Sequence, residues 1–396
     1  MRAVFYTVPA YLDAALPLVR ALSQRVTLHL MMEIAPESWN SALFDVAPRQ
    51  LPAGIVAADP VLRDCFPPGV QRYWENCASF DLVVHKTTTF RPGSWAVSQQ
   101  AARYIKSIRP DLLHLDAGSL RLAPALRGLN GARLVLSVHD PTPHSGEHSW
   151  RKDLMNRLTF ARTQHFVLYN RGAMAAFAEE YRIPADRVDA STLGSYEIYR
   201  EWLDGGTTES DRTVFFFGRL SPYKGLEYLY QAATEIANQV PGVRLVVAGK
   251  AVSGYTPPPP PELPNGGQVE LIEGYISNAR LAELCQKATL VVCPYVDATQ
   301  SGVVLTAYAF RKPVVATRVG GLPEYVEDGK TGYLVPPRDS AALADAVVKI
   351  LLNPVKRQEM KRNIEALAGS RLSWETIADQ MVDVYRRTLG GEGTQG

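Results

Sequence analysis

The sequence has almost no net charge and no long apolar run. Its 396 residues include 42 Lys and Arg against 40 Asp and Glu, so it lacks the clustered basic excess that nucleic-acid binding requires. No apolar run reaches the roughly 18 residues that span a bilayer, and the first residues are typical of a strand and not of a signal peptide. We therefore expect a cytoplasmic protein, with peripheral contact to the inner face of the membrane as an open alternative.

Several short motifs are also missing. The four cysteines, Cys65, Cys77, Cys285 and Cys293, form no Cys-x-x-Cys pair, which suits packing roles in a reducing compartment. No Gly-x-Gly-x-x-Gly follows the first apolar segment, residues 2–7, and dinucleotide binding of the Rossmann type is therefore unsupported. No Asp-x-Asp stands near a predicted strand end to hold magnesium, so we expect neither a metal nor another cofactor.

Short apolar segments alternate with amphipathic ones along the chain, which predicts a doubly wound α/β protein. Apolar residues make up 46% and charged residues 21%, as in ordinary globular proteins, and the length favours two domains. Strands are predicted at 2–7, 26–32, 81–87, 111–115, 132–138, 165–169, 213–217, 243–249, 269–273, 290–294 and 313–317, and helices at 10–22, 94–108, 149–162, 225–238, 278–286, 302–310, 354–368 and 374–389. The polar segment 194–212 is predicted to link a domain of residues 1–204 to one of residues 212–372.

The most informative stretch is residues 214–230. An apolar run ends at Gly218, a polar loop carries Arg219 and Lys224, and an apolar-periodic helix starts after Gly225. The N–H groups at a helix N-terminus favour an anion, and two cations beside them add to that preference. This arrangement predicts a clamp for a diphosphate, the alternative being two solvated surface cations on a loop.

This stretch contains Phe-Gly-Arg-Leu-Ser-Pro-Tyr-Lys-Gly, and Ala-Phe-Arg-Lys-Pro-Val-Val-Ala-Thr-Arg-Val-Gly-Gly-Leu-Pro-Glu follows downstream. Together they resemble the C-terminal domain of glycosyltransferase family 4, closely over residues 212–340 and only in outline in the N-terminal half. The resemblance implies a GT-B fold, in which two Rossmann-like, doubly wound domains face each other across a cleft and the last helix, 374–389, crosses back onto the first domain. It also implies a retaining transfer from a nucleotide sugar.

A second candidate region follows the strand predicted at 132–138. The loop of residues 139–148 holds three of the seven histidines, and in open α/β sheets ligands bind outside the carboxyl ends of the strands. The candidates there are His139 and the acceptor-side residues Asp140, His144 and Glu147. A structural His-Asp turn and a metal site that also uses His148 are alternatives, although the spacing matches no standard metal signature. In the family, the histidine that ends this strand lies near the donor sugar and the acceptor, and His139 looks like its match.

The helix predicted at 302–310 supplies further donor-binding candidates. Gly302 opens this helix, so the free N–H groups of its first turn can approach a phosphate closely. The donor-binding candidates are Gly218, Gln300, Ser301, Gly302, Val303 and Thr306. Most family members carry two glutamates eight residues apart here, whereas this chain has Ala298 and Thr306 in one alignment and Thr299 and Ala307 in another. Thr306, Thr299 and Gln300 then offer neutral hydrogen bonds to ribose or sugar hydroxyls.

Together with these candidates, the resemblance implies a retaining glycosyltransferase with His139, Arg219 and Lys224 as catalytic residues. The two cations neutralise the departing diphosphate without a metal, and the diphosphate helps to deprotonate the acceptor in a same-face attack. The expected partners are a nucleotide-sugar donor and a hydroxyl acceptor that is a glycan, lipid-linked or a small molecule, in cell-surface glycan or polysaccharide biosynthesis. A catalytically silent nucleotide-sugar-binding protein and a sugar-nucleotide epimerase are the alternatives.

The helix predicted at 149–162 is basic. It carries Arg151, Lys152, Arg157 and Arg162 beside apolar residues. A basic amphipathic helix can lie on an anionic membrane, but we favour the interpretation that this is a solvated helix face.

Overall fold

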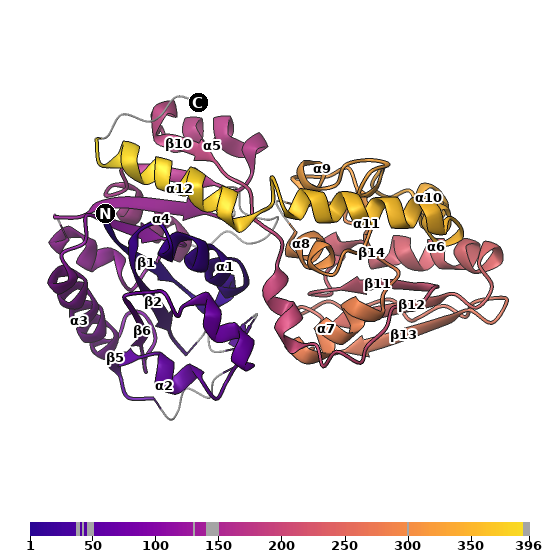
Figure 1. The fold of residues 1–396 in the computed structure, drawn as a ribbon, viewed down its shortest axis with the longest axis horizontal. Coiled ribbons are helices and arrows are strands. Elements are labelled where there is room, and N and C mark those ends of the chain that lie inside the picture. The colour runs from indigo at the N-terminus through magenta and orange to yellow at the C-terminus, as the bar shows by residue number, and fades with distance from the viewer. Residues whose placement is uncertain are drawn as a thin grey trace. The chain divides into compact units, whose positions relative to one another are not determined.

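The computed structural model describes residues 1–36, 40–41, 43–45, 51–129, 131–139, 150–298 and 301–390. The chain forms two compact units, one of Met1–Leu193 with Trp374–Gly396 and one of Gly194–Ser373. Each unit is built on a mostly parallel sheet with helices packed against it (Figure 1). No helix in these ranges is long and apolar enough to cross a bilayer.

The first unit contains an eight-stranded sheet in the order β10-β9-β8-β7-β1-β2-β6-β5. Neighbouring strands are parallel except β5, which runs antiparallel to β6. The strands are β1 (Arg2–Thr7), β2 (Thr27–Ile34), β5 (Gly54–Ala57), β6 (Ser79–Val84), β7 (Leu112–Leu115), β8 (Arg133–Val138), β9 (His165–Leu168) and β10 (Val188–Ala190), with β3 (Asn40–Ser41) and β4 (Phe44–Asp45) forming a separate pair. The helices are α1 (Leu12–Ser23), α2 (Asp59–Leu62), α3 (Pro92–Ile108), α4 (Trp150–Phe160), α5 (Met174–Glu180) and α12 (Trp374–Thr388), and a 3-10 turn, η4, spans Ala123–Gly128.

The second unit contains a six-stranded, entirely parallel sheet in the order β13-β12-β11-β14-β15-β16. Its strands are β11 (Thr213–Phe217), β12 (Arg244–Gly249), β13 (Gln268–Glu273), β14 (Leu290–Cys293), β15 (Val314–Thr317) and β16 (Gly332–Val335). Its helices are α6 (Leu226–Gln239), α7 (Asn278–Lys287), α8 (Gly302–Ala309), α9 (Leu322–Tyr325), α10 (Ser340–Leu352) and α11 (Pro354–Ala368). Strand β11 lies inside the sheet and is buried at every position, as expected for a strand covered on both faces.

Helix α12 completes the first unit although it follows the second unit in the chain. Arg25, just after α1, places its Nε 2.6 Å from Asp379 Oδ1. Tyr385 is fully buried, and its hydroxyl lies 2.6 Å from His114 Nδ1 in strand β7. The helix therefore belongs to the core of the first unit.

The division between the units differs from the predicted one. Residues 194–204, which the sequence analysis assigned to the first domain, group with the second unit. The backbone explains this, because the Tyr196 N–H donates to Leu305 O at 3.2 Å and the Ser195 N–H donates to Leu372 O at 3.3 Å.

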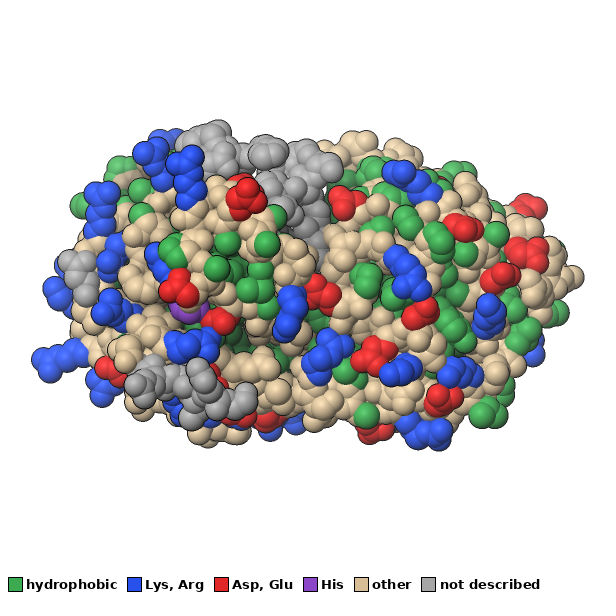
Figure 2. Space-filling model, turned by 90° about the horizontal axis from the view of Figure 1, so that it is seen from above, with side chains coloured by type: hydrophobic (Ala, Val, Ile, Leu, Met, Phe, Trp, Pro, Cys, Tyr) green, Lys and Arg blue, Asp and Glu red, His purple; other side chains and the backbone are tan. Residues whose placement is uncertain are grey.

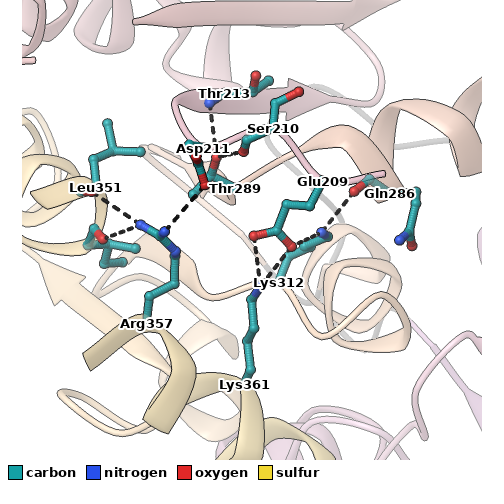
Figure 3. Close-up of polar contacts among 11 residues, drawn as sticks. Glu209, Ser210, Asp211, Thr213, Gln286, Thr289, Lys312, Leu351, Arg357 and Lys361 are labelled. Atoms are coloured by element: carbon teal, nitrogen blue, oxygen red, sulfur yellow. Dashed lines mark hydrogen bonds and ion pairs between the residues drawn. The ribbon is translucent and has the colours of Figure 1, made fainter. Parts of the chain in front are cut away.

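The polar segment just before β11 is also fixed to the second unit (Figure 3). Glu209 Oε2 accepts a hydrogen bond from Lys312 Nζ at 2.5 Å, and both oxygens of this carboxylate lie 2.7 Å from Lys361 Nζ. Lys312 Nζ donates in addition to Gln286 O at 2.9 Å. The end of the predicted linker is therefore an ordered part of the second unit.

Candidate functional site

Two glycines shape the loop between β11 and α6. Gly218 has a φ of +115° and Gly225 a φ of +64°, conformations that residues with a side chain rarely adopt. A Cβ at Gly225 would lie 2.0 Å from Pro294 O, and one at Gly218 would lie 3.6 Å from Val303 Cγ2. The loop therefore runs directly against the end of β14 and the first turn of α8.

Lys224 is a buried cation in this loop. It is 8% exposed, and its Nζ lies 3.8 Å from the centre of the Tyr295 ring and 5.5 Å from that of Tyr223, within the range of a cation–π attraction. Within the described part of the chain, Nζ forms no hydrogen bond and no ion pair. Burial lowers the pKa of Lys224 to about 8, an effect that Cys293 opposes and Arg219 reinforces. Below pH 8, Lys224 is thus a desolvated ammonium that an anion would stabilise.

Arg219 carries the positive charge of the loop to the surface. Its side chain is exposed, and it forms neither an ion pair nor a hydrogen bond with any residue that the structure describes. Its charge helps to lower the pKa of Lys224, so the two cations repel each other. A ligand with two or more negative charges relieves this repulsion, and a diphosphate is such a ligand.

Ser221 is a polar residue of the loop that the sequence analysis missed. It is 3% exposed, and its Oγ has no hydrogen-bond partner among the described residues. It stands between Arg219 and Lys224, just before the 3-10 turn η8 (Pro222–Lys224). Because an unpaired buried hydroxyl is costly, Ser221 is a further candidate for contact with a ligand of this loop. No motif marks a serine for this role.

The start of α8 lies close to an aromatic ring. A Cβ at Gly302 would lie 3.0 Å from Tyr196 Cε2, so glycine allows the helix and this ring to approach. The preceding Ser301 is buried, and its Oγ lies 3.3 Å from Tyr295 OH instead of capping the helix. The first turn of α8, beside the cationic loop, thus keeps the preference for an anion that an uncapped helix start has.

Thr306 does not present a free donor. It is 3% exposed, and its hydroxyl donates to Gly302 O at 2.8 Å, one helical turn back. A hydroxyl so engaged can contact a ligand only as an acceptor. In the predicted hydrogen bond between Thr306 and a ribose hydroxyl, the ribose hydroxyl is therefore the donor and Thr306 the acceptor.

Residues 317–320, at and after the end of β15, contact the segment that follows β14. Gly320 has a φ of +49°, and a Cβ there would lie 1.5 Å from Ala298 O, so only glycine fits. The Thr317 hydroxyl donates to Tyr295 O at 2.6 Å. These contacts fix the segment after β14 and with it the ring on which Lys224 Nζ rests.

His139 lies just beyond the carboxyl end of β8, in the first unit. It is 8% exposed, its Nε2 is 3.1 Å from Asp116 Oδ1, and Asp116 Oδ2 accepts from the Thr7 hydroxyl at 2.7 Å. The imidazole stacks on Tyr11 with 3.8 Å between ring centres, and Tyr169 lies 4.8 Å away. Thr7, Asp116 and His139 stand at the carboxyl ends of three adjacent strands, the edge where open α/β sheets bind ligands.

His114, in contrast, is a structural histidine. It is completely buried, with Nδ1 2.6 Å from Tyr385 OH and Nε2 2.9 Å from Ser137 Oγ. Burial lowers the pKa of His114 to about 4, although Asp116 opposes this effect. The ring is therefore neutral at physiological pH and links α12 to the sheet.

Glu33 forms a second polar cluster in the first unit. Its carboxylate accepts hydrogen bonds from Tyr6 OH at 2.8 Å and from Ser119 Oγ at 2.5 Å, and it lies 3.3 Å from Arg121 Nη1. Burial, followed by the Glu33 charge, raises the pKa of Tyr6 well above its usual value. Glu33 precedes its partner Arg121 by 88 residues, and no sequence motif indicates the pairing.

Several predicted site residues lie outside the described residues. These are Asp140, His144, Glu147 and His148 in the first unit and Thr299 and Gln300 in the second. Their roles stay predictions, as does the alternative of a metal site that uses the histidines.

Two family models match the chain. Residues 211–353 match the family described as Glycosyl transferases group 1, and residues 58–190 match Glycosyltransferase Family 4. The first match contains the cationic loop with Arg219 and Lys224, and the second contains His139.

Curated relatives carry names of sugar transferases. Alpha-D-kanosaminyltransferase of Streptomyces kanamyceticus is 31% identical over 44% of this chain and 45% of its own length. D-inositol 3-phosphate glycosyltransferase of Segniliparus rotundus is 34% identical over 47% of this chain and 42% of its own. Phosphatidyl-myo-inositol mannosyltransferase of Mycobacterium leprae is 29% identical over 76% of this chain and 79% of its own. The chain thus spans less than half the length of the first two relatives.

Solved structures share the fold. HepE of Anabaena in complex with UDP-glucose has a TM-score of 0.64 at 18% identity, covering 98% of this chain and 100% of that one. Sucrose-phosphate synthase of Thermosynechococcus elongatus has a TM-score of 0.64 at 16% identity, with coverage of 98% and 100%. At these identities the likeness shows the architecture alone, and the predicted GT-B α/β fold is confirmed.

Proposed function

Because the chain belongs to glycosyltransferase family 4, we propose that it transfers a sugar from a nucleotide-sugar donor to a hydroxyl group of an acceptor. The observation that carries this proposal is the pair of cations on the β11–α6 loop, of which Lys224 is buried without a carboxylate partner in the described chain and Arg219 is exposed. HepE structures contain UDP and UDP-glucose, which makes uridine nucleotides the first donors to test. An acceptor in cell-surface glycan synthesis fits the same proposal.

In the proposed donor site, Arg219 and Lys224 bind the diphosphate, and the first turn of α8 at Gly302 adds backbone N–H groups. A charge-assisted hydrogen bond of this kind contributes on the order of 1.5–3 kcal/mol. Negative charge builds up on the leaving diphosphate as its bond to the sugar breaks, so the two cations stabilise the transition state more than the bound donor. This chemistry requires no metal ion.

We also propose that the transfer retains the anomeric configuration. Ala298 and Thr306 stand where one alignment expects the family's two glutamates, and the Thr306 hydroxyl donates a hydrogen bond to Gly302 O. Neither residue offers a carboxylate as nucleophile. The proposal is therefore a same-face attack, in which the departing diphosphate helps to deprotonate the acceptor hydroxyl.

We assign His139 to the transfer step and not to nucleotide binding. Asp116 and the stacked Tyr11 ring orient its imidazole, so little reorganisation is needed when substrate binds. The variant His139→Ala should lower turnover by about a hundredfold and leave nucleotide affinity nearly unchanged. Melting temperature, nucleotide affinity and rate are measured on the same preparation. A destabilised variant, or one with a normal rate, would remove His139 from the reaction.

A panel of nucleotide sugars tests the activity itself. Uridine, guanosine and adenosine diphosphate sugars are screened by thermal shift, and transfer to hydroxyl acceptors is then followed by release of the nucleoside diphosphate. We expect the diphosphate sugars of one nucleoside to raise the melting temperature and at least one of them to support turnover. Binding without turnover for every donor would identify a silent nucleotide-sugar-binding protein, and the absence of binding would contradict the proposal.

A further inference from the structure

The first unit has an apolar groove at the N-terminal end of α3. The groove has a volume of about 450 Å³, and its apolar walls include Phe90, Pro92, Trp95, Leu120, Leu154 and Leu158. Helices α3 and α4 both pack against the 3-10 turn η4, so the groove runs between two helices over that turn. None of the residues placed in catalysis or donor binding lines it.

Two exposed aromatic side chains stand at this groove. Phe90 is 58% exposed and Trp95 is 61% exposed, and the other aromatic side chains described in the first unit are buried or only partly exposed. Large apolar side chains that are exposed together beside an apolar groove often mark an interaction surface, whereas single exposed apolar side chains are common on any protein. Trp is in addition the side chain that membrane interfaces favour, because its ring is apolar and its N–H is polar.

The charge along α3 and the residues that flank it is of one sign. Residues 86–110 contain five Lys and Arg, all of them exposed, and neither Asp nor Glu, although the whole chain is nearly balanced. Along α3, Trp95, Arg103 and Lys106 lie within about 80° of helical rotation and therefore share one face. Arg103 and Lys106 form no ion pair with the described residues.

This basic face is on the outside of the first unit. Helix α3 lies at the edge of that unit (Figure 1), and several Lys and Arg side chains are visible on the face of the first unit that Figure 2 shows. Exposed cations beside exposed aromatic rings match the charge and polarity profile of an anionic lipid bilayer, where phosphates lie directly outside the acyl region.

We propose that this face of the first unit docks on an anionic membrane surface. Phe90 and Trp95 enter the boundary between headgroups and acyl chains, and Arg91, Arg103 and Lys106 lie over the lipid phosphates. The proposal extends the one made for the reaction, because it concerns where the enzyme works and not what it transfers. It also differs from the membrane alternative drawn from the sequence, which rested on the helix at 149–162.

Vesicle co-sedimentation tests the docking surface with the full chain. The wild type should bind vesicles of phosphatidylcholine with phosphatidylglycerol, bind pure phosphatidylcholine vesicles weakly, and lose binding as salt screens the charges. The double variant Phe90→Ala with Trp95→Ala should lower the partition coefficient by about tenfold or more. A second variant, Arg91→Glu with Arg103→Glu, should abolish the preference for the anionic lipid.

A matched control changes two exposed apolar residues of the second unit. Leu352 is 58% exposed and Val355 is 77% exposed, and the variant Leu352→Ala with Val355→Ala should bind vesicles like the wild type. Melting temperature and nucleotide binding establish that each variant is folded, and neither should change. A wild type that ignores anionic vesicles, or an aromatic variant that binds like the control, would overturn the proposal. A wild-type dimer that the aromatic variant dissociates would also overturn it and would assign the groove to a second copy of the chain.

Discussion

Two buried lysines of the second unit are in opposite situations. Lys312 is 1% exposed and donates to Glu209 and to Gln286 O, with Lys361 at the same carboxylate (Figure 3). Lys224 is 8% exposed and rests on the Tyr295 ring, with no carboxylate at ion-pair distance among the described residues. Burial lowers the pKa of both lysines, but Glu209 opposes this effect at Lys312.

The difference separates a cation that the fold compensates from one that, in the proposed function, a ligand compensates. A buried ammonium costs several kcal/mol unless an opposite charge compensates it. The fold supplies that charge to Lys312 through Glu209 and does not supply it to Lys224. A perturbed and uncompensated cation in a glycine-shaped loop therefore points to a partner outside the chain, which in the proposed function is the donor diphosphate.

Removal of the uncompensated lysine should have the largest effect. The variant Lys224→Ala loses a cation that stabilises the leaving group, and kcat/KM should fall by about a hundredfold to a thousandfold. The melting temperature should stay unchanged or rise, because a buried charge without a partner is lost. Steady-state kinetics and thermal denaturation measure both. Lys349→Ala, at an exposed lysine of α10, serves as the control. An unchanged rate in Lys224→Ala would contradict the proposed role of Lys224 in the reaction.

Removal of the compensating carboxylate should act on stability instead. The variant Glu209→Gln leaves Lys312 buried beside a neutral amide, and the free energy of unfolding should fall by about 3 kcal/mol. Urea denaturation measures this loss, while nucleotide affinity of the folded protein should not change. Lys361 is 20% exposed, so Lys361→Ala should cost only about 1 kcal/mol. A stable Glu209→Gln protein with altered nucleotide affinity would show that the two lysines do not differ in role.

The low pKa of Lys224 should make both stability and nucleotide affinity depend on pH. Its pKa is about 8 in the folded protein against 10.5 ordinarily, so between these values the unfolded chain binds more protons and the contribution of Lys224 to stability rises with pH. An anion binds the protonated form, so nucleotide affinity should fall as the pH rises through 8, by up to about tenfold per pH unit above it. Calorimetry from pH 7 to 9.5 measures the affinity. The variant Lys224→Arg, which stays charged, should lose this dependence, and an equally steep fall in that variant would assign it to another group.

Chelation should have the smallest effect. Since Arg219 and Lys224 already neutralise the diphosphate in the proposed site, excess chelator should change the transfer rate by less than about twofold. The rate is measured with and without chelator on the protein as purified. Loss of the rate on chelation, with recovery on addition of manganese, would contradict a diphosphate site without metal. It would also weaken the inference that Lys224 neutralises the diphosphate.

The strand–loop–helix segment from β11 to α6 could be predicted because its determinants are local. Gly218, Arg219, Lys224 and Gly225 belong to one strand–loop–helix segment, and each acts through residues close by in the sequence or through a helix start. The alternation of strands and helices could also be predicted, because short apolar segments alternate with amphipathic ones in the sequence. Short elements without a clear period were not predicted, among them β5 (Gly54–Ala57) and β16 (Gly332–Val335).

The long-range partners of His139 and of the structural carboxylate Glu209 could not be predicted, because they are distant in the chain. His139 meets Asp116 across 23 residues, and Glu209 meets Lys361 across 152. Pairings of this kind depend on strand order, which composition and spacing do not define. Thr306 shows a second limit, since the sequence reveals a hydroxyl but not its hydrogen bond to the carbonyl one turn back.

Helix α12 has a consequence for how the protein is made. The first 193 residues leave the ribosome early, but the core that they form also needs Tyr385, which hydrogen-bonds to the buried His114. The second unit, complete within residues 194–373, is translated in between and has all its strands and helices available sooner. Domains usually fold in the order of their synthesis, whereas here the unit that is begun first is the one finished last.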